Sequence, residues 1–442
     1  MSVTSRLGPR ARHIVDAGSG TLLGNATGVL LPFMITIIYG SGRLTDGYFL
    51  AAASANFVVI LTASTEGVSI PYFVRVRAAH GAGGGRVTGQ LLRRGVGLSV
   101  ALLVPAYAIT GVLVVPHGGF SPGQRGQVLL LLVVLSPLPL AAAASSVFAS
   151  AHYAYGRFWL PTATQALRSS AALLCVLGGA AGVPLVVAAG ALTVGELLRA
   201  AILLTRLPCA RPAPGDLLLR EPLECYRSTA LPAVLSMVIV CVNPLIDKAV
   251  AGSTGPAGIT TLELAEKLFY VPTILFGGMV ASVLASDWAS VHQRTGCLRA
   301  VAPDFWRTQR LVLGGATGLT LVATAVAAIV GPGAAGLLRL PSGTQFALVL
   351  CLYLAGLPAT FFIEVSGRLV TTLRINQIMP WLSGLAVVLN LVLDLLGREL
   401  FGLAGIALST TLVRFVGAGV LFWWVRRSFA REPANPLAEL AR

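Results

Sequence analysis

Apolar runs of about 20 residues recur along the whole chain, separated by short polar segments that are rich in arginine. Each run is long enough to cross the roughly 30 Å of hydrocarbon in a bilayer as a helix. None alternates apolar and polar residues, as the strands of a membrane barrel do. The pattern predicts an all-α polytopic membrane protein with about twelve transmembrane helices, at approximately 17–40, 46–73, 95–115, 127–150, 158–180, 183–205, 228–251, 258–288, 310–330, 344–370, 379–397 and 401–425.

The two halves of the chain repeat the same signals. Pro139 and Pro161 lie 22 residues apart, as do Pro358 and Pro380, and the turn after the first span (YGSGRLTDG) corresponds to the turn after the seventh (AGSTGPAG). Because each half holds an even number of spans, both halves start on the same side, which indicates a parallel pseudo-repeat. The sequence therefore predicts an N-terminal six-helix lobe at 1–205, a cytoplasmic linker at 206–227 and a C-terminal six-helix lobe at 228–442.

Composition supports the membrane assignment and explains the net charge. Only 11% of the 442 residues are charged, against about a quarter in a soluble protein. The net charge of +15 comes from arginines that gather in alternate loops. The positive-inside rule then places both termini in the cytoplasm, and no nucleic-acid partner is expected. The six cysteines are scattered without a CxxC pair and are expected to be reduced.

Three charges lie on one turn of the predicted span at 258–288. Glu263, Glu266 and Lys267 have i, i+3 and i+4 spacing, which places them on one helical face. A charge at the bilayer centre costs roughly 2.5–3.5 kcal/mol on insertion scales. We therefore expect this face to line a protein or water-filled interior, where the three residues are candidates for substrate binding. An internal ion pair that only holds helices together is the alternative.

Other polar residues inside predicted spans have functional and structural interpretations. Glu66 shares a helical face with Thr62 and is a candidate cavity acid. Asp46 begins the second span, where it fits either a helix cap or a cavity residue. Asn56 fits a cavity residue or a hydrogen bond between helices.

Two further pairs of charges are spaced to neutralise themselves along one helix. Glu196 and Arg199 are i, i+3, and Glu364 and Arg368 are i, i+4, so structural ion pairs are favoured for both. Arg414 is a lone arginine in mid-span and needs a partner that the sequence does not name.

No enzymatic motif was found. The sequence contains no GxSxG, HExxH or P-loop, and no ATPase domain, so neither catalysis nor a cofactor is expected. Uphill transport would need an ion gradient, the membrane potential or a partner protein. A membrane enzyme is disfavoured further because the outer loops are short.

Several segments together resemble a known family. The segments GSGRLTDGYFLAA with the following TEG, NPLIDKAVAG with LELAEKLFYVPTILFGGMVASVLASDWA, and the late VVLNLVLDLL and GLAGIALSTTLVRF are similar to the MurJ/MviN-type lipid II flippases of the multidrug/oligosaccharidyl-lipid/polysaccharide exporter superfamily. The similarity runs through nearly the whole chain. It implies a multi-pass flippase of the bacterial cytoplasmic membrane that moves a lipid-linked glycan, such as the peptidoglycan precursor lipid II, by alternating access.

The resemblance also implies roles for individual residues. Asp46, Glu66, Glu266 and Lys267 match polar positions of the family's central cavity, where basic residues are thought to engage a pyrophosphate. Asn25, Leu31 and Val59 stand close to cavity-facing positions that typically carry arginine in the family, and Asn25 is a further candidate for the cavity. Lys267 keeps the charge of the family's usual arginine without its bidentate fork.

Other functions remain open on the sequence alone. The chain fits an exporter of a polysaccharide repeat unit or an amphiphilic secondary metabolite, with a coupling cation carried by Glu66 or Glu266. It also fits a non-transporting scaffold of the cell wall. The expected partners are accordingly a lipid-linked glycan or other amphiphile, membrane lipids and, for an antiporter, a cation.

Overall fold

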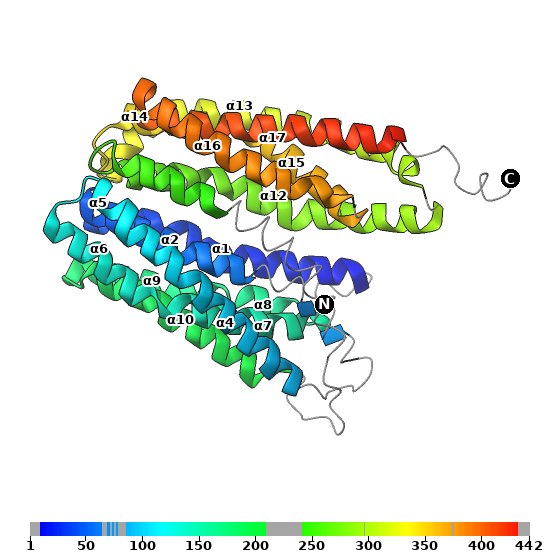
Figure 1. Cartoon of the computed structure of the whole chain (residues 1–442), viewed down its shortest axis with the longest axis horizontal. Helices are drawn as coiled ribbons and strands as arrows, with labels where there is room; N and C mark the ends of the chain where they lie inside the picture. Colours follow the sequence, from blue (N-terminus) through cyan, green and yellow to red (C-terminus); the bar gives the residue numbers. More distant parts are fainter. Residues whose placement is uncertain are drawn as a thin grey trace, which may run out of the picture. The chain divides into compact units, whose positions relative to one another are not determined.

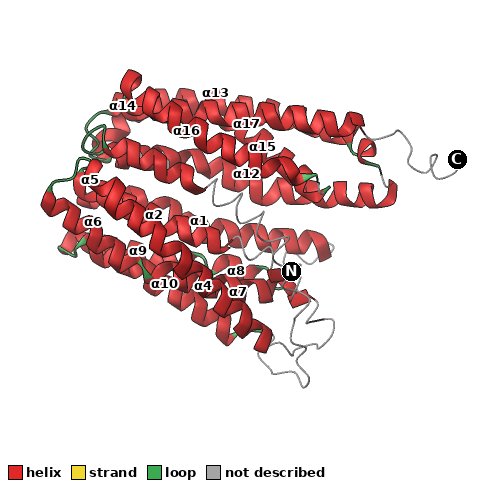
Figure 2. Ribbon diagram, in the orientation of Figure 1, coloured by secondary structure: helices red, strands yellow, loops and turns green. Residues whose placement is uncertain are grey.

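The computed structural model describes the chain in two compact units. Its described residues are 9–63, 69–70, 73–74, 77, 85–208, 241–295, 297–373 and 375–431. Figure 2 shows helices and connecting loops, with no strand among these residues. The two units are Met1–Thr260 and Thr261–Arg442. The predicted linker at 206–227 and the predicted span at 228–251 lie mostly outside the described residues, so the lobe boundary stays a prediction.

The first unit is a helical bundle (Figure 1). Two of its predicted spans are each divided into two consecutive helices, α6 with α7 and α8 with α9. Helix α4 continues through one π-helical turn, η2, into α5. Its elements are α1 (Pro9–Tyr39), α2 (Arg43–Ala63), α4 (Gly85–Ile109), η2 (Thr110–Val114), α5 (Val115–His117), α6 (Pro122–Leu135), α7 (Pro137–Ala154), α8 (Trp159–Ala163), α9 (Ala166–Leu177), η3 (Gly178–Ala181) and α10 (Leu185–Thr205).

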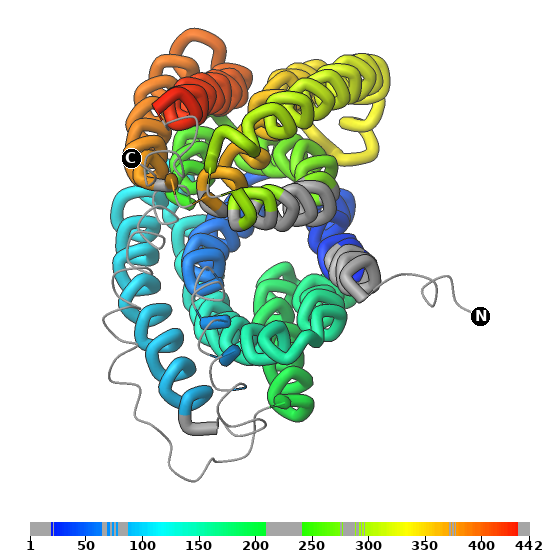
Figure 3. Tube along the Cα trace, turned by 90° about the vertical axis from the view of Figure 1, so that its right-hand side faces the viewer, coloured from blue at the N-terminus to red at the C-terminus, as the bar shows by residue number. Residues whose placement is uncertain are grey.

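Neighbouring helices in the sequence are not always neighbours in the bundle. Helix α1 packs along α8 and α9, whereas α2 packs along α4, α6 and α7. Figure 3 shows the same arrangement, with α1 in dark blue beside the green α9 and apart from α2. The two helices meet only at the tight turn between them, where Gly40 has a φ of +80° that an L side chain rarely adopts.

Among the described residues, the two longest helices are α12 (Gly258–Thr295) and α13 (Ala302–Leu337), which belong to the second unit except for the first three residues of α12 (Figure 1). Trp288 of α12 packs at its core with Phe305 of α13 and Phe429 of α17. The bounds of its elements are α12 (Gly258–Thr295, whose first three residues belong to the first unit), η4 (Leu298–Ala300), α13 (Ala302–Leu337), α14 (Gly343–Ala355), α15 (Leu357–Thr372), η5 (Asn376–Ile378), α16 (Met379–Phe401) and α17 (Leu403–Arg431).

One helix in each unit, α6 in the first and α14 in the second, begins with the same kind of N-terminal cap. Before α6, the Ser121 amide donates to the Gln124 side chain at 2.9 Å. Before α14, the Ser342 hydroxyl accepts from the Gln345 amide at 3.2 Å. Both are N-terminal caps of the S-x-x-Q type. The capped helices then break at Ser136 and Gly356, each shortly before a proline. This correspondence is consistent with the repeat that the proline spacing predicts.

The helices have the lengths and surfaces of membrane spans. Within the described residues, 9 helices are long and apolar enough to cross a bilayer. The predicted span at 158–180 is not among them because α8 and α9 divide it. Leu321 and Ile329 of α13 are 69% and 79% exposed. A soluble protein rarely exposes such an apolar face, so the all-α polytopic prediction is confirmed.

Candidate functional site

The charged turn of α12 is mostly buried in the second unit. The Lys267 ammonium lies 3.2 Å from the Glu263 carboxylate, and their side chains are 33% and 9% exposed. Glu N-terminal to Lys at i, i+4 is the favourable order on a helix. Glu266, one turn along from Glu263, is also buried. Lys267 is therefore the most accessible charge of this turn, and a buried carboxylate holds it in place.

Arg414 of α17 lies between aromatic rings rather than beside an acid. Its guanidinium carbon is 4.0 Å from the ring centre of Phe269 on α12 and 5.8 Å from that of Tyr353 on α14. Both rings are fully buried. Such cation–π contacts contribute about 2 kcal/mol or more when they are desolvated. The partner that the sequence could not name is thus an aromatic pair.

Asp46 caps the start of α12 from within the first unit. Its fully buried carboxylate accepts hydrogen bonds from the Ala257 amide at 2.8 Å, the Thr260 amide at 2.9 Å and the Thr260 hydroxyl at 2.8 Å. A helix N-terminus has unpaired amides and a partial positive charge, which a carboxylate satisfies. Asp46 thus serves a helix that begins more than 200 residues away rather than its own helix.

The turn that Asp46 holds is conformationally strained. Ala257 has a φ of 64°, in the left-handed region. This conformation costs an L residue about 1–2 kcal/mol. Its amide is one of those that donate to Asp46. The strained turn therefore depends on the carboxylate that binds it.

Arg43, one turn before Asp46, hydrogen-bonds two further loops, which contain Gly118 and Gly252. One of its guanidinium nitrogens donates to the Gly118 carbonyl at 3.0 Å and to the Gly252 carbonyl at 2.8 Å. Gly119 has a φ of +71°, and a Cβ there would meet the Arg43 guanidinium at 2.8 Å, so both conformation and space favour glycine. We call Arg43, Asp46 and the backbone groups they bind the turn clasp.

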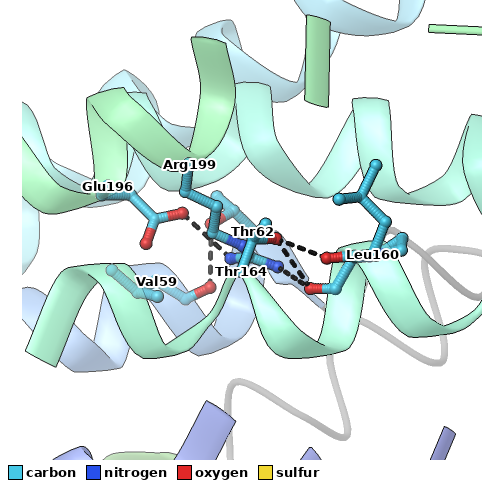
Figure 4. A network of polar contacts seen from close by, with 7 residues as sticks. Val59, Thr62, Leu160, Thr164, Glu196 and Arg199 are labelled. Atoms are coloured by element: carbon cyan, nitrogen blue, oxygen red, sulfur yellow. Dashed lines mark hydrogen bonds and ion pairs between the residues drawn. The ribbon is translucent and has the colours of Figure 1, made fainter. Parts of the chain in front are cut away.

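Glu196 and Arg199 form a buried ion pair in the first unit. Figure 4 shows the Arg199 guanidinium reaching the Glu196 carboxylate, a distance of 3.0 Å. A second guanidinium nitrogen lies 3.5 Å from the Pro161 carbonyl of α8. The side chains are 9% and 1% exposed. Removal of one partner from such a pair costs about 3–5 kcal/mol, and this burial supports a structural role.

The other predicted site residues lie apart. Asn25 on α1 and Asn56 on α2 are half-buried in the first unit. Glu66 lies outside the described residues. On α15, Glu364 is half-buried and Arg368 is exposed. No ion pair joins Glu364 and Arg368, although both are among the residues that the structure describes.

Sequence reasoning missed a buried polar pair on α16. The Asn390 amide donates to the Asp394 carboxylate at 3.0 Å, and the residues are 1% and 0% exposed. The signal was the N-x-x-x-D spacing inside VVLNLVLDLL, which places both on one helical face. An ionisable residue buried in a membrane helix is a functional candidate by default.

Comparison with known proteins identifies relatives of this chain. A family model described as lipid II flippase MurJ matches residues 35–439. The lipid II flippase MurJ of Burkholderia cenocepacia is 22% identical over 299 residues, which is 64% of this chain and 57% of that protein. The aligned region thus spans less than two thirds of that relative's length.

Solved structures share the fold. A structure of the lipid II flippase MurJ in an inward closed conformation superposes with a TM-score of 0.74 at 16% identity, covering 92% of this chain and 87% of that chain. An inward-facing multidrug resistance MATE family transporter superposes with a TM-score of 0.70 at 13% identity, covering 95% of this chain and 98% of that chain. Both relatives are transporters with this helical architecture.

Proposed function

Because the chain belongs to the lipid II flippase MurJ family, we propose that it is a flippase that moves a lipid-linked glycan across the bacterial cytoplasmic membrane by alternating access. The family is one of transporters rather than enzymes, and the chain is a multi-pass membrane protein. Both termini are assigned to the cytoplasm from the distribution of arginine.

The accessible ammonium of Lys267 is the observation that carries this proposal. It is one-third exposed, while its partner Glu263 is buried. A lipid-linked glycan presents a phosphate or pyrophosphate next to its lipid, and a cation in a region of low dielectric attracts such an anion strongly. Leu31 and Val59, which stand near the family's usual arginine positions, are buried and uncharged. The anion contact is therefore assigned to Lys267, acting as a point charge.

The turn clasp supports the alternating-access part of the proposal. It joins the turns after the predicted first and seventh spans, which the sequence places together on the outer face. Alternating access requires such contacts to form and break in each cycle. The strained φ of Ala257 lowers the free-energy cost of breaking the hydrogen bonds to Asp46, because the backbone of the turn relaxes once they are broken. We assign the clasped arrangement to a state that is closed on the outer side.

Asp394 is the acid that we assign to cation coupling. It is fully buried on α16, where burial of a carboxylate is costly unless a cation or polar groups compensate it. Its carboxylate accepts from the Asn390 amide at 3.0 Å, so an ionisable and a polar side chain lie together on one face of α16. This observation also favours the second candidate function, a cation-coupled exporter of a different amphiphile.

Complementation tests the proposed cargo. The chain would be expressed in bacterial cells depleted of their own lipid II flippase, and membrane insertion would be checked by immunoblotting of membrane fractions. We expect the wild-type chain to restore growth and Lys267→Ala to restore it poorly. The exposed Arg368→Ala serves as a matched control, since it also removes one positive charge. A correctly inserted wild-type chain that fails to restore growth would eliminate lipid II as the cargo.

A further inference from the structure

A basic pocket lies at the end of the second unit where α17 finishes, near the red C-terminal end of the helix in Figure 1. Its volume is about 300 Å³. Four of its lining residues come from the last two turns of α17, and the remaining walls come from η4 and from the turn before α16. The α17 residues are Trp424, Arg427, Ser428 and Arg431.

The spacing of these four residues explains why they converge. Intervals of three, one and three residues place them on one face of the helix. Gln377 of η5 adds a polar side chain to the lining, and Leu298 and Ile375 add apolar side chains. The pocket thus combines two guanidinium groups, a side-chain amide, a hydroxyl group and apolar side chains.

The guanidinium groups of the pocket are not neutralised by any acid in the part of the chain that the structure describes. Arg427 lies over the ring of Trp423, with 5.1 Å from its guanidinium carbon to the ring centre. Neither Arg427 nor Arg431 forms an ion pair within the described residues. Stacking on a ring leaves the edge of a guanidinium free to donate hydrogen bonds.

The carbonyl end of α17 does not repel an anion from this pocket, because a different arginine covers it. Arg299 of η4 donates to the Phe429 carbonyl at 2.9 Å and to the Ala430 carbonyl at 2.9 Å. These carbonyls carry the negative end of the helix dipole. Arg299 is engaged there, and Arg427 and Arg431, which have no acid partner among the described residues, can pair with an external anion.

Tryptophans place the pocket at the level of the lipid headgroups. Trp381, at the start of α16, is 79% exposed, and Trp423 is 51% exposed. The Trp424 indole donates to the Ile375 carbonyl at 3.0 Å, which fixes it in the pocket wall. Exposed tryptophans gather at the boundary between the hydrocarbon and the headgroups of a bilayer. The anion nearest to such a pocket belongs to a membrane lipid.

We propose that this pocket binds the phosphodiester headgroup of an anionic phospholipid. The two guanidinium groups pair with the phosphate, as arginine does in bidentate contacts. The Ser428 hydroxyl, which donates to the Trp424 carbonyl at 2.9 Å, accepts a hydrogen bond from the headgroup alcohol, and Gln377 donates to it. The acyl chains pass over the apolar side chains of Leu298 and Ile375 into the bilayer. The site stands in the second unit alone and does not depend on the identity of the transported cargo.

Binding of soluble lipid analogues to the purified full chain tests this site. The probes are dioctanoyl phosphatidylglycerol, dioctanoyl phosphatidylcholine and inorganic phosphate, each titrated in detergent and followed by the thermal shift of the protein. We expect saturable stabilisation by phosphatidylglycerol and none by phosphatidylcholine at the same concentration. Inorganic phosphate should not compete, since it lacks the apolar part. Equal competition by phosphate would assign the pocket to a soluble anion and overturn the lipid assignment.

Charge variants distinguish the pocket from general surface charge. Arg427→Gln combined with Arg431→Gln should weaken binding of phosphatidylglycerol at least tenfold. Arg426→Gln combined with Arg294→Gln removes the same charge from exposed positions outside the pocket and should leave binding within about twofold. Arg427→Lys keeps the charge, loses the fork and should give an intermediate affinity. Equal weakening by the pocket pair and by the control pair would refute the proposal, as would unaltered binding in the pocket pair.

Discussion

Loss of the Asp46 charge should release the start of α12. The change Asp46→Asn keeps the shape of the side chain and one acceptor oxygen. It removes the charge and turns the NH2 of the side-chain amide, itself a donor, toward one of the three donors, which are the Ala257 amide, the Thr260 amide and the Thr260 hydroxyl. Because hydrogen bonds to charged groups contribute about 1.5–3 kcal/mol each, the weakening of two of them should cost about 3 kcal/mol in the clasped arrangement.

That magnitude predicts a measurable opening of the turn. A free-energy change of about 3 kcal/mol corresponds to roughly a 100-fold change in an equilibrium constant. Amide hydrogen exchange reports such local opening directly. In exchange followed by mass spectrometry, peptides that cover residues 253–262 should exchange on the order of 100-fold faster in Asp46→Asn than in the wild type.

The control for this experiment is another loss of one carboxylate charge. Glu399 lies at the end of α16, and its side chain is 68% exposed. Glu399→Gln should leave exchange at 253–262 unchanged. A second variant, Ala257→Gly, relieves the positive φ while the cap stays in place, so it should slow exchange. Unaltered exchange in Asp46→Asn would show that the carboxylate does not hold the turn, and the clasp would have to be abandoned.

Three further predictions follow from the geometry of the second unit. Lys267→Ala should reduce transport more than Arg368→Ala, and Lys267→Arg should retain most of it, as measured by growth of flippase-depleted cells; equal tolerance of both alanine variants would remove Lys267 from the site. Arg414→Met should lower the unfolding free energy by about 2 kcal/mol through loss of the contacts with buried rings, which a thermal melt in detergent would detect. Asp394→Asn should abolish the dependence of transport on an imposed cation gradient, so a retained dependence would exclude Asp394 as the coupling acid.

The membrane spans, the family motifs and the contacts within a single helix could be predicted from the sequence. Hydropathy predicts the spans because apolar length is a local property, and the helical architecture is confirmed. The family was also predicted correctly from its motifs. Spacing of i, i+3 or i, i+4 suffices for contacts such as Glu196 with Arg199, because the helix itself sets the distance.

Contacts between distant segments could not be predicted in this way. Asp46 binds Ala257, 211 residues away, and nothing in the spacing of a membrane span identifies such a partner. Arg414 lies against Phe269 and Tyr353, which come from two other helices. A lone arginine in an apolar run suggests an acid, so an aromatic pair is found only in three dimensions.

Local spacing also misled at two places. The apolar composition of 158–180 predicts one continuous span, whereas the chain there folds as α8 and α9 with a break between them. Glu364 and Arg368 have the spacing of an ion pair, yet Arg368 is exposed and the pair is not formed. Solvation of the guanidinium competes with a surface ion pair that contributes only about 0–1 kcal/mol.

Direct measurement of flipping tests the central claim that this chain moves a lipid-linked glycan. The purified chain would be reconstituted into liposomes that contain a labelled undecaprenyl-linked muropeptide, and the fraction of label accessible to an external enzyme would be followed with time. We predict that label from the inner leaflet becomes accessible with the wild-type chain and much more slowly with Lys267→Ala. Accessibility that stays at one half, as in protein-free liposomes, would contradict the account.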